Sequence, residues 1–136
     1  MTMFNVFDVA GSGMSAQSLR LNTTASNLAN ADSVSGDIET AYRSRHPHFQ
    51  AVMDGFDNPD SVSVRVDNIV RSGAPVEARY QPEHPEADEE GYVYASNVNP
   101  VEEMVNMLSA SRAYQNNIEV ISTTREMMQR TLQMGQ

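Results

Sequence analysis

Apolar residues recur every seven positions at both ends of this 136-residue chain, and they do not do so in its middle. Such spacing is typical of the a and d positions of a helix that lies along another helix. In the first third the repeat consists of Phe7, Met14, Leu21 and Leu28, with Phe4, Gly11, Ser18 and Ala25 three places before each. In the last third it consists of Met107, Tyr114, Ile121 and Met128, with Met104, Ser111, Ile118, Arg125 and Leu132 in a complementary row. The two ends are therefore predicted to be helices that pair with each other or with copies of other chains.

The N-terminal repeat predicts a helix over about residues 4–30, a range that contains no proline. Gly11 and Gly13 lie inside it and each costs roughly 1 kcal/mol relative to alanine. Such glycines indicate either a close approach of another backbone, or a bend and a poorly formed first turn and a half. The polar cluster of residues 30–37 ends the helix. A helix of this composition is marginal in isolation and depends on tertiary contacts.

The C-terminal repeat predicts a longer helix, which begins at Asn99 and Pro100. Asn99 is a suitable N-cap, Pro100 suits the first helical position, and two acidic residues follow in the first turn. Residues 101–134 contain no proline or glycine, so this helix could extend for about 50 Å at 1.5 Å per residue. Most of its apolar stripe needs a partner helix, since the middle of the chain is too small to cover it.

The middle of the chain predicts a small antiparallel β insertion. Short alternating stretches are separated by glycines and prolines that suit hairpin loops, and these stretches are residues 49–53, 61–66, 76–80 and 92–94. The segment 54–59 fits no pattern. The predicted fold class is α+β, with an N-terminal helix in residues 1–31, a β-rich insertion in 32–98 and a C-terminal helix in 99–136.

The formal charge of −9 is concentrated in the middle of the chain. Residues 1–31 sum to zero, residues 101–136 to −1 and residues 32–100 to −8. Nearly uncharged helices can approach one another closely, whereas an acidic middle favours water. The chain has no lysine, which argues against a basic patch for nucleic acid or anionic lipid, and no cysteine for disulfides or thiolate ligands. No secretory signal peptide or membrane span is visible, so export would need another route.

No motif in the sequence predicts catalysis. His46 and His48 could supply two metal ligands, but no third follows with suitable spacing, and solvated loop histidines are the better interpretation. The acidic run 86–91 lacks the ligand order of a calcium loop. Ser12 and Ser15 have no partners placed for a nucleophile triad. We therefore expect a non-enzymatic protein with no cofactor, no metal site, no nucleic acid partner and no small-molecule substrate.

Neutral hydrogen-bonding side chains are unusually frequent on both predicted helices. A helix that simply faced water would carry more lysine and glutamate. Amides and hydroxyls can be buried at modest cost when each finds a partner, so these helices suit an environment of other helices. A chance bias toward uncharged polar residues is the alternative. Candidates for lateral hydrogen bonds between chains are Asn22, Asn27 and Asn30.

Several segments resemble the bacterial flagellar basal-body rod proteins. Residues 12–17 (SGMSAQ) and 21–31 (LNTTASNLANA) resemble the N-terminal signature of that family. Residues 97–105 (NVNPVEEMV) and 109–117 (SASRAYQNN) resemble its C-terminal signature. The short length and residues 80–93 (YQPEHPEADEEGYV) are similar to its proximal rod subunits. The resemblance covers the chain nearly end to end.

This resemblance implies a structural subunit that self-assembles with other rod proteins into a helical drive shaft, which crosses the periplasm and transmits torque for motility. It implies export through the flagellar type III apparatus without a cleaved signal peptide. The terminal helices would form the inner layer of a tube, and the middle segment would face outward. Expected partners are other rod subunits, copies of this chain, and membrane-ring and export-gate proteins at the rod base, with no insertion into the membrane.

The predicted assembly interface combines the repeat with the polar candidates. Its apolar members are Phe7, Met14, Leu21, Leu28, Met107, Tyr114, Ile118, Ile121 and Met128, and its polar members are the three asparagines named above. A soluble coiled-coil adaptor would show the same repeat and would be helical and stable when purified. A rod subunit should have largely disordered ends until it assembles.

Overall fold

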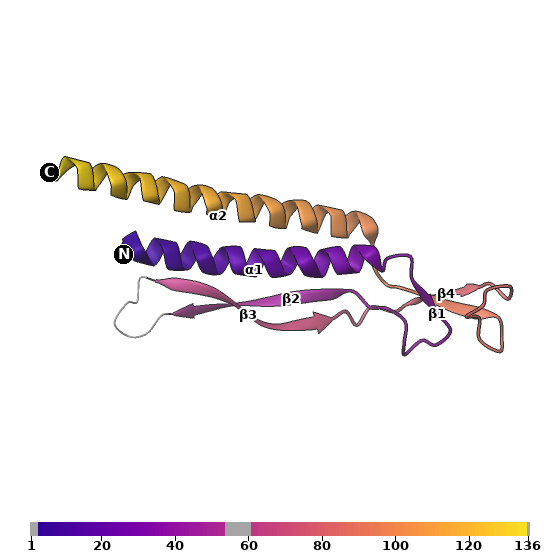
Figure 1. Ribbon diagram of the computed structural model, residues 1–136. Helices are drawn as coiled ribbons and strands as arrows, with labels where there is room; N and C mark the ends of the chain where they lie inside the picture. Colours follow the sequence, from indigo (N-terminus) through magenta and orange to yellow (C-terminus); the bar gives the residue numbers. More distant parts are fainter. Residues whose placement is uncertain (1–2, 54–60, 136) are drawn as a thin grey trace.

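The part of the chain that the structure describes folds into two long helices and two small antiparallel sheets. The computed structural model describes residues 3–53 and 61–135. The elements are α1 (Met3–Ala29), β1 (Val34–Ser35), β2 (Arg45–Met53), β3 (Val62–Arg71), β4 (Glu77–Tyr80), β5 (Tyr92–Ala95) and α2 (Pro100–Met134). In Figure 1, α1 lies between α2 on one side and the β2–β3 hairpin on the other, and β1, β4 and β5 extend beyond one end of the helices. This arrangement confirms the predicted α+β class with terminal helices and an antiparallel insertion.

Both helices form where local sequence favours them. The Asn99 side chain accepts hydrogen bonds from the Val101 and Glu102 amides at 3.1 and 3.5 Å, and Pro100 occupies the first turn. This is the predicted N-cap. In α1 the helix runs without interruption through Gly11 and Gly13. The alternative of a poorly formed first turn and a half is therefore wrong.

The β insertion is divided into two sheets that are not hydrogen-bonded to each other. β2 and β3 form a hairpin that packs along α1, while β1, β5 and β4 form a separate three-stranded sheet in that order. The hairpin extends past the predicted strands, to a pair formed by Arg45 and Arg71. His46 and His48 consequently lie on β2, so the prediction that they are loop residues is wrong. The unassigned segment 54–59 lies outside the described residues.

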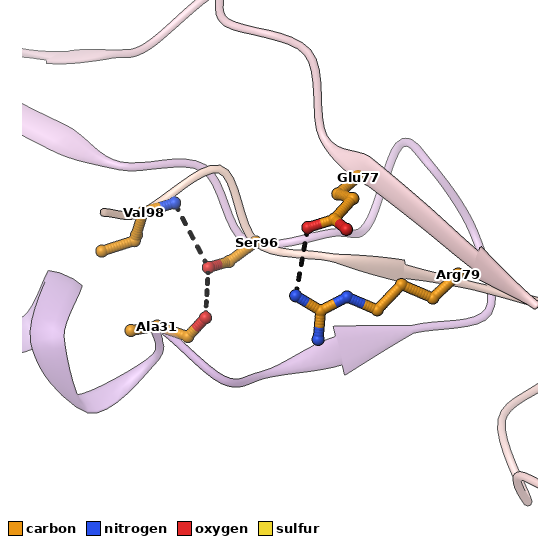
Figure 2. Close-up of polar contacts among 5 residues, drawn as sticks. All are labelled: Ala31, Glu77, Arg79, Ser96 and Val98. Atoms are coloured by element: carbon orange, nitrogen blue, oxygen red, sulfur yellow. Dashed lines mark hydrogen bonds and ion pairs between the residues drawn. The ribbon is translucent and has the colours of Figure 1, made fainter. Parts of the chain in front are cut away.

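The segment between β5 and α2 holds the start of α2 beside the end of α1. Figure 2 shows the Ser96 hydroxyl, which donates to the Ala31 carbonyl at 2.8 Å and accepts from the Val98 amide at 3.3 Å. The Ser96 amide also donates to the Ser33 carbonyl at 3.2 Å. The same figure shows an ion pair between Arg79 and Glu77 on β4, at 3.1 Å. One serine thus connects the chain before β1 to the chain after β5, and this contact holds the segment that leads into α2 beside the end of α1.

The buried core is small. Seven apolar residues are buried in the described ranges, and five of them are alanines: Ala10, Ala16, Ala41, Val93, Ala95, Val98 and Ala110. Because stabilisation by burial scales with apolar area, alanines contribute much less than leucines or phenylalanines would. Most of the large apolar side chains of the described residues are half-buried or exposed at the surface.

Candidate assembly interface

The two helices pair in antiparallel fashion along a seam that contains polar contacts. Near the middle of α1, a β-carbon added to Gly13 would lie only 3.0 Å from the side-chain amide nitrogen of Asn117, so the helices approach closely there. Further along, Arg20 donates to the Asn106 side-chain carbonyl at 3.1 Å. At the far end, Asn27 donates to the Glu103 carboxylate at 3.1 Å. Gly13, Arg20 and Asn27 follow one another at seven-residue intervals along α1, which is the predicted period for this helix.

The predicted repeat divides into two rows with different environments. One row is half-buried in the folded chain, and its members are Phe7, Met14, Leu21, Leu28, Met107, Tyr114, Ile121 and Met128. The second row is mostly exposed, including Phe4, Met104 and Leu132. Ile118 belongs to this second row and is 45% exposed in the folded chain, and its place in the assembly interface stays a prediction. A packed pair of helices buries one stripe on each, and the second row lies beside that stripe.

Sequence reasoning missed the residues that α2 buries most completely. These are Glu103, Ala110 and Thr124, which lie on one row with Asn117 at seven-residue spacing. Small or polar residues lie where the helices approach closest, and a search for apolar residues passes over them. The recurrence of compact or polar side chains at one heptad position was the signal that could have found this row.

Asn27 is the centre of a buried polar network. Its side chain is 0% exposed, and its amide nitrogen donates to the Arg45 carbonyl at 2.8 Å as well as to Glu103. Its carbonyl oxygen accepts from the Tyr42 hydroxyl at 3.0 Å and from the Arg45 amide at 2.9 Å. A side-chain amide has two donors and two acceptor sites, so every site is occupied within the chain. The lateral bond predicted for Asn27 stays a prediction, and it would require one of these four hydrogen bonds to be exchanged.

The other two asparagines retain capacity for an outside partner. Asn30 donates one side-chain hydrogen bond to the Ser26 carbonyl at 2.8 Å and is half-buried. Asn22 is exposed and makes no side-chain hydrogen bond to any described residue. Both remain predicted lateral contacts.

The outer face of α2 carries an apolar patch. Val101, Met104, Val105 and Leu108 have i, i+3, i+4 and i+7 spacing, and each is between 55% and 70% exposed. Such spacing places four side chains on one side of a helix. The patch lies away from the seam and has the pattern that a helix shows when it packs against another helix. We call these four residues the outer patch.

The structure supplies little for chemistry. Within residues 3–53 and 61–135 no three histidine, cysteine, aspartate or glutamate side chains are grouped to hold a metal ion, and no helix is long and apolar enough to cross a membrane. A hydrogen bond from Arg79 to Glu77 raises the pKa of Arg79. Burial, and then the nearby Asp88 carboxylate, raise the pKa of Tyr94. Both shifts move titration further from neutral pH, so neither prepares a group for acid–base catalysis.

Known proteins resemble this chain over its whole length. Residues 7–36 match the family described as Flagella basal body rod protein, and residues 89–134 match Flagellar basal body rod FlgEFG protein C-terminal. The flagellar basal-body rod protein FlgC of Salmonella typhimurium is 48% identical over 136 residues, with 100% of each chain covered. The protein of the same name from Escherichia coli O157:H7 is 47% identical over 136 residues, again with 100% of each chain covered. That of Aquifex aeolicus is 43% identical over 133 residues, covering 98% of this chain and 97% of the relative.

Proposed function

The chain belongs to the family of flagellar basal-body rod proteins, and we propose that it is a structural subunit of the rod of the bacterial flagellar basal body. Its partners are then other components of the rod. A subunit with this function buries surface against neighbouring subunits rather than binding a substrate.

The observation that carries the proposal is the unequal division of apolar residues between core and surface. In the described ranges seventeen large apolar side chains are exposed, nine of them on α2, whereas the buried apolar residues are mostly alanines. Extended apolar surface on a chain with a small core marks a protein that completes its burial in an assembly. The near neutrality of the two helices supports close packing of copies, since like charges do not oppose it.

Further details extend this proposal. The terminal helices, 1–31 and 99–136, would form the inner part of a tube with the outer patch against neighbouring subunits, and residues 32–98 would lie outside them. The rod would cross the periplasm and transmit torque, and the chain would reach it through the flagellar type III export system. Neighbours would include copies of this chain and, at the rod base, membrane-ring and export-gate proteins. In this role the chain has no enzymatic activity.

A double substitution in the outer patch tests the assembly function. Val105→Asp with Leu108→Asp places two charges on side chains that are exposed in the isolated chain, so its thermal unfolding midpoint should change little. In the assembly the same charges would have to be desolvated, which is costly without partners. In a flagellated strain that lacks the native copy, we expect the variant to be absent from isolated basal bodies and swimming to be lost.

The matched control introduces the same charges on the exposed hairpin, as Gln50→Asp with Asn68→Asp. This variant should swim and should appear in basal bodies. Normal swimming of the outer-patch variant would contradict burial of this face, and normal swimming of a strain lacking the chain altogether would contradict the rod function.

A further inference from the structure

Three arginines surround a hollow at the end of the hairpin nearest the three-stranded sheet. The hollow has a volume of about 430 Å³ and is lined by Glu39, Thr40, Ala41, Tyr42, Arg43, Arg45 and Arg71. We call it the arginine pocket. Three positive charges against one carboxylate leave it net positive, although the chain as a whole carries −9.

The arginine pocket contains a like-charge pair that the fold does not neutralise. Arg45 and Arg71 are direct partners in the antiparallel ladder of β2 and β3. Like charges directly opposite each other on neighbouring strands are destabilising. No ion pair joins either arginine, or Arg43, to a carboxylate in residues 3–53 or 61–135. An anion bound between the strands would remove this repulsion.

Neighbouring groups hold two of the arginines in place. Arg43 donates to the Ala74 carbonyl at 3.0 Å, which uses one of its five N–H groups. The Arg45 guanidinium lies over the Tyr42 ring, 5.5 Å from its centre, and the Tyr42 hydroxyl is held by Asn27. Guanidinium groups have a planar fork of donors that matches a carboxylate. The arginine pocket is therefore suited to side-chain carboxylates.

The same chain presents a loop of the opposite charge. Residues 81–91, between β4 and β5, include Glu83, Glu86, Glu89 and Glu90, which are exposed and make no side-chain hydrogen bond or ion pair to any residue that the structure describes. Asp88 shapes the loop from within, since its carboxylate accepts from the Glu90 and Tyr92 amides at 3.0 and 2.8 Å. We call this segment the acidic loop. It extends beyond the helices at one end of the molecule (Figure 1).

We propose that the arginine pocket of one copy of this chain binds the acidic loop of a second copy. The inference rests on charge complementarity. The arginines of the arginine pocket and the glutamates of the acidic loop make no ion pairs with each other within the described part of one chain. A contact between two different surfaces adds copies in one direction, as a helical assembly requires. The inference rests on the proposed assembly function and names one contact that would set the register between neighbours.

A double-mutant cycle on the full-length chain tests the contact. Arg45→Gln with Arg71→Gln removes the charge of the pocket, and Glu86→Gln, Glu89→Gln and Glu90→Gln remove that of the loop. Sedimentation velocity measures self-association. We expect each set to weaken the association constant at least about tenfold, and the two sets combined to weaken it no further, because both remove one interaction. Arg79→Gln, an arginine outside the pocket, should leave association unchanged.

Other outcomes would overturn the proposal. Losses that simply add would mean that pocket and loop act independently, and self-association that is absent or insensitive to both sets would mean that they do not meet. Binding of inorganic phosphate that depends on Arg71, together with charge-insensitive association, would make the arginine pocket a small-anion site. In each case the outer-patch test of the rod function would stand separately, since it uses other residues and another measurement.

Discussion

Asn27 shows how one residue can hold together parts of the chain that are distant in sequence. Its side-chain nitrogen connects α1 to β2 by donating to the Arg45 carbonyl, and connects α1 to α2 by donating to the Glu103 carboxylate. Its side-chain oxygen accepts a hydrogen bond from the Tyr42 hydroxyl. Glu103 is 2% exposed, and a buried carboxylate without a hydrogen-bond donor would be costly. The network therefore specifies where α1, β2 and α2 meet. Apolar contacts among alanines have no directional preference and would specify this position less well.

Replacement of Asn27 should be severe. Asn27→Ala leaves the Glu103 carboxylate and the Arg45 amide without these partners, and we expect a loss of about 2–4 kcal/mol in the free energy of unfolding, as for several buried polar groups left unsatisfied. Urea denaturation followed by circular dichroism measures it. Asn22→Ala, on the exposed side of the same helix, should change stability by no more than about 0.5 kcal/mol. Equal effects of the two substitutions would show that the network contributes nothing.

The elements differ in how far their sequence predicted them. α2 follows from local chemistry, because Asn99, Pro100 and an uninterrupted run of residues determine where it begins and how long it continues. The β insertion does not follow from local chemistry, because alternating residues identify strands but not the strands with which they pair. The division into two sheets depends on packing of the β2–β3 hairpin against α1. The register that extends to Arg45 and Arg71, and with it the arginine pocket, arises from this long-range pairing.

The close approach of α1 and α2 is tested by two glycines on one helix. A side chain at Gly13 meets Asn117, whereas a β-carbon at Gly11 meets nothing within 4 Å. Gly13→Leu should overpack the seam and cost about 1–3 kcal/mol. Gly11→Leu should be neutral or stabilising by up to about 1 kcal/mol, because it removes a glycine from a helix without a clash. Thermal unfolding by circular dichroism compares them, and a higher midpoint for Gly13→Leu than for Gly11→Leu would contradict this packing.

For the whole molecule, the seven-residue period was sufficient to predict two helices that pair, but not which row would face inward. Both rows contain apolar residues, and the choice depends on where compact residues such as Gly13 and Ala110 permit close approach. In the folded chain Ile118 lies on the exposed row and Asn27 is buried, which the seven-residue period alone did not predict. A chain that assembles needs apolar residues both inside and outside the monomer, so apolarity alone does not separate fold from interface.

Leu21 offers a test in which fold and assembly are measured together. It belongs to the half-buried row of α1, with Phe7, Met14 and Leu28. Leu21→Asp places a charge on a half-buried side chain that assembly would desolvate further, and without a partner a desolvated charge is strongly unfavourable. We expect the variant to be missing from isolated basal bodies and the cells not to swim in soft agar. Leu21→Met keeps the volume and apolar character of the side chain, so it should cost less than about 1.5 kcal/mol and preserve swimming. Swimming by the aspartate variant would show that this row is not desolvated in the rod, and the predicted interface would then have to be restricted to the outer face of α2.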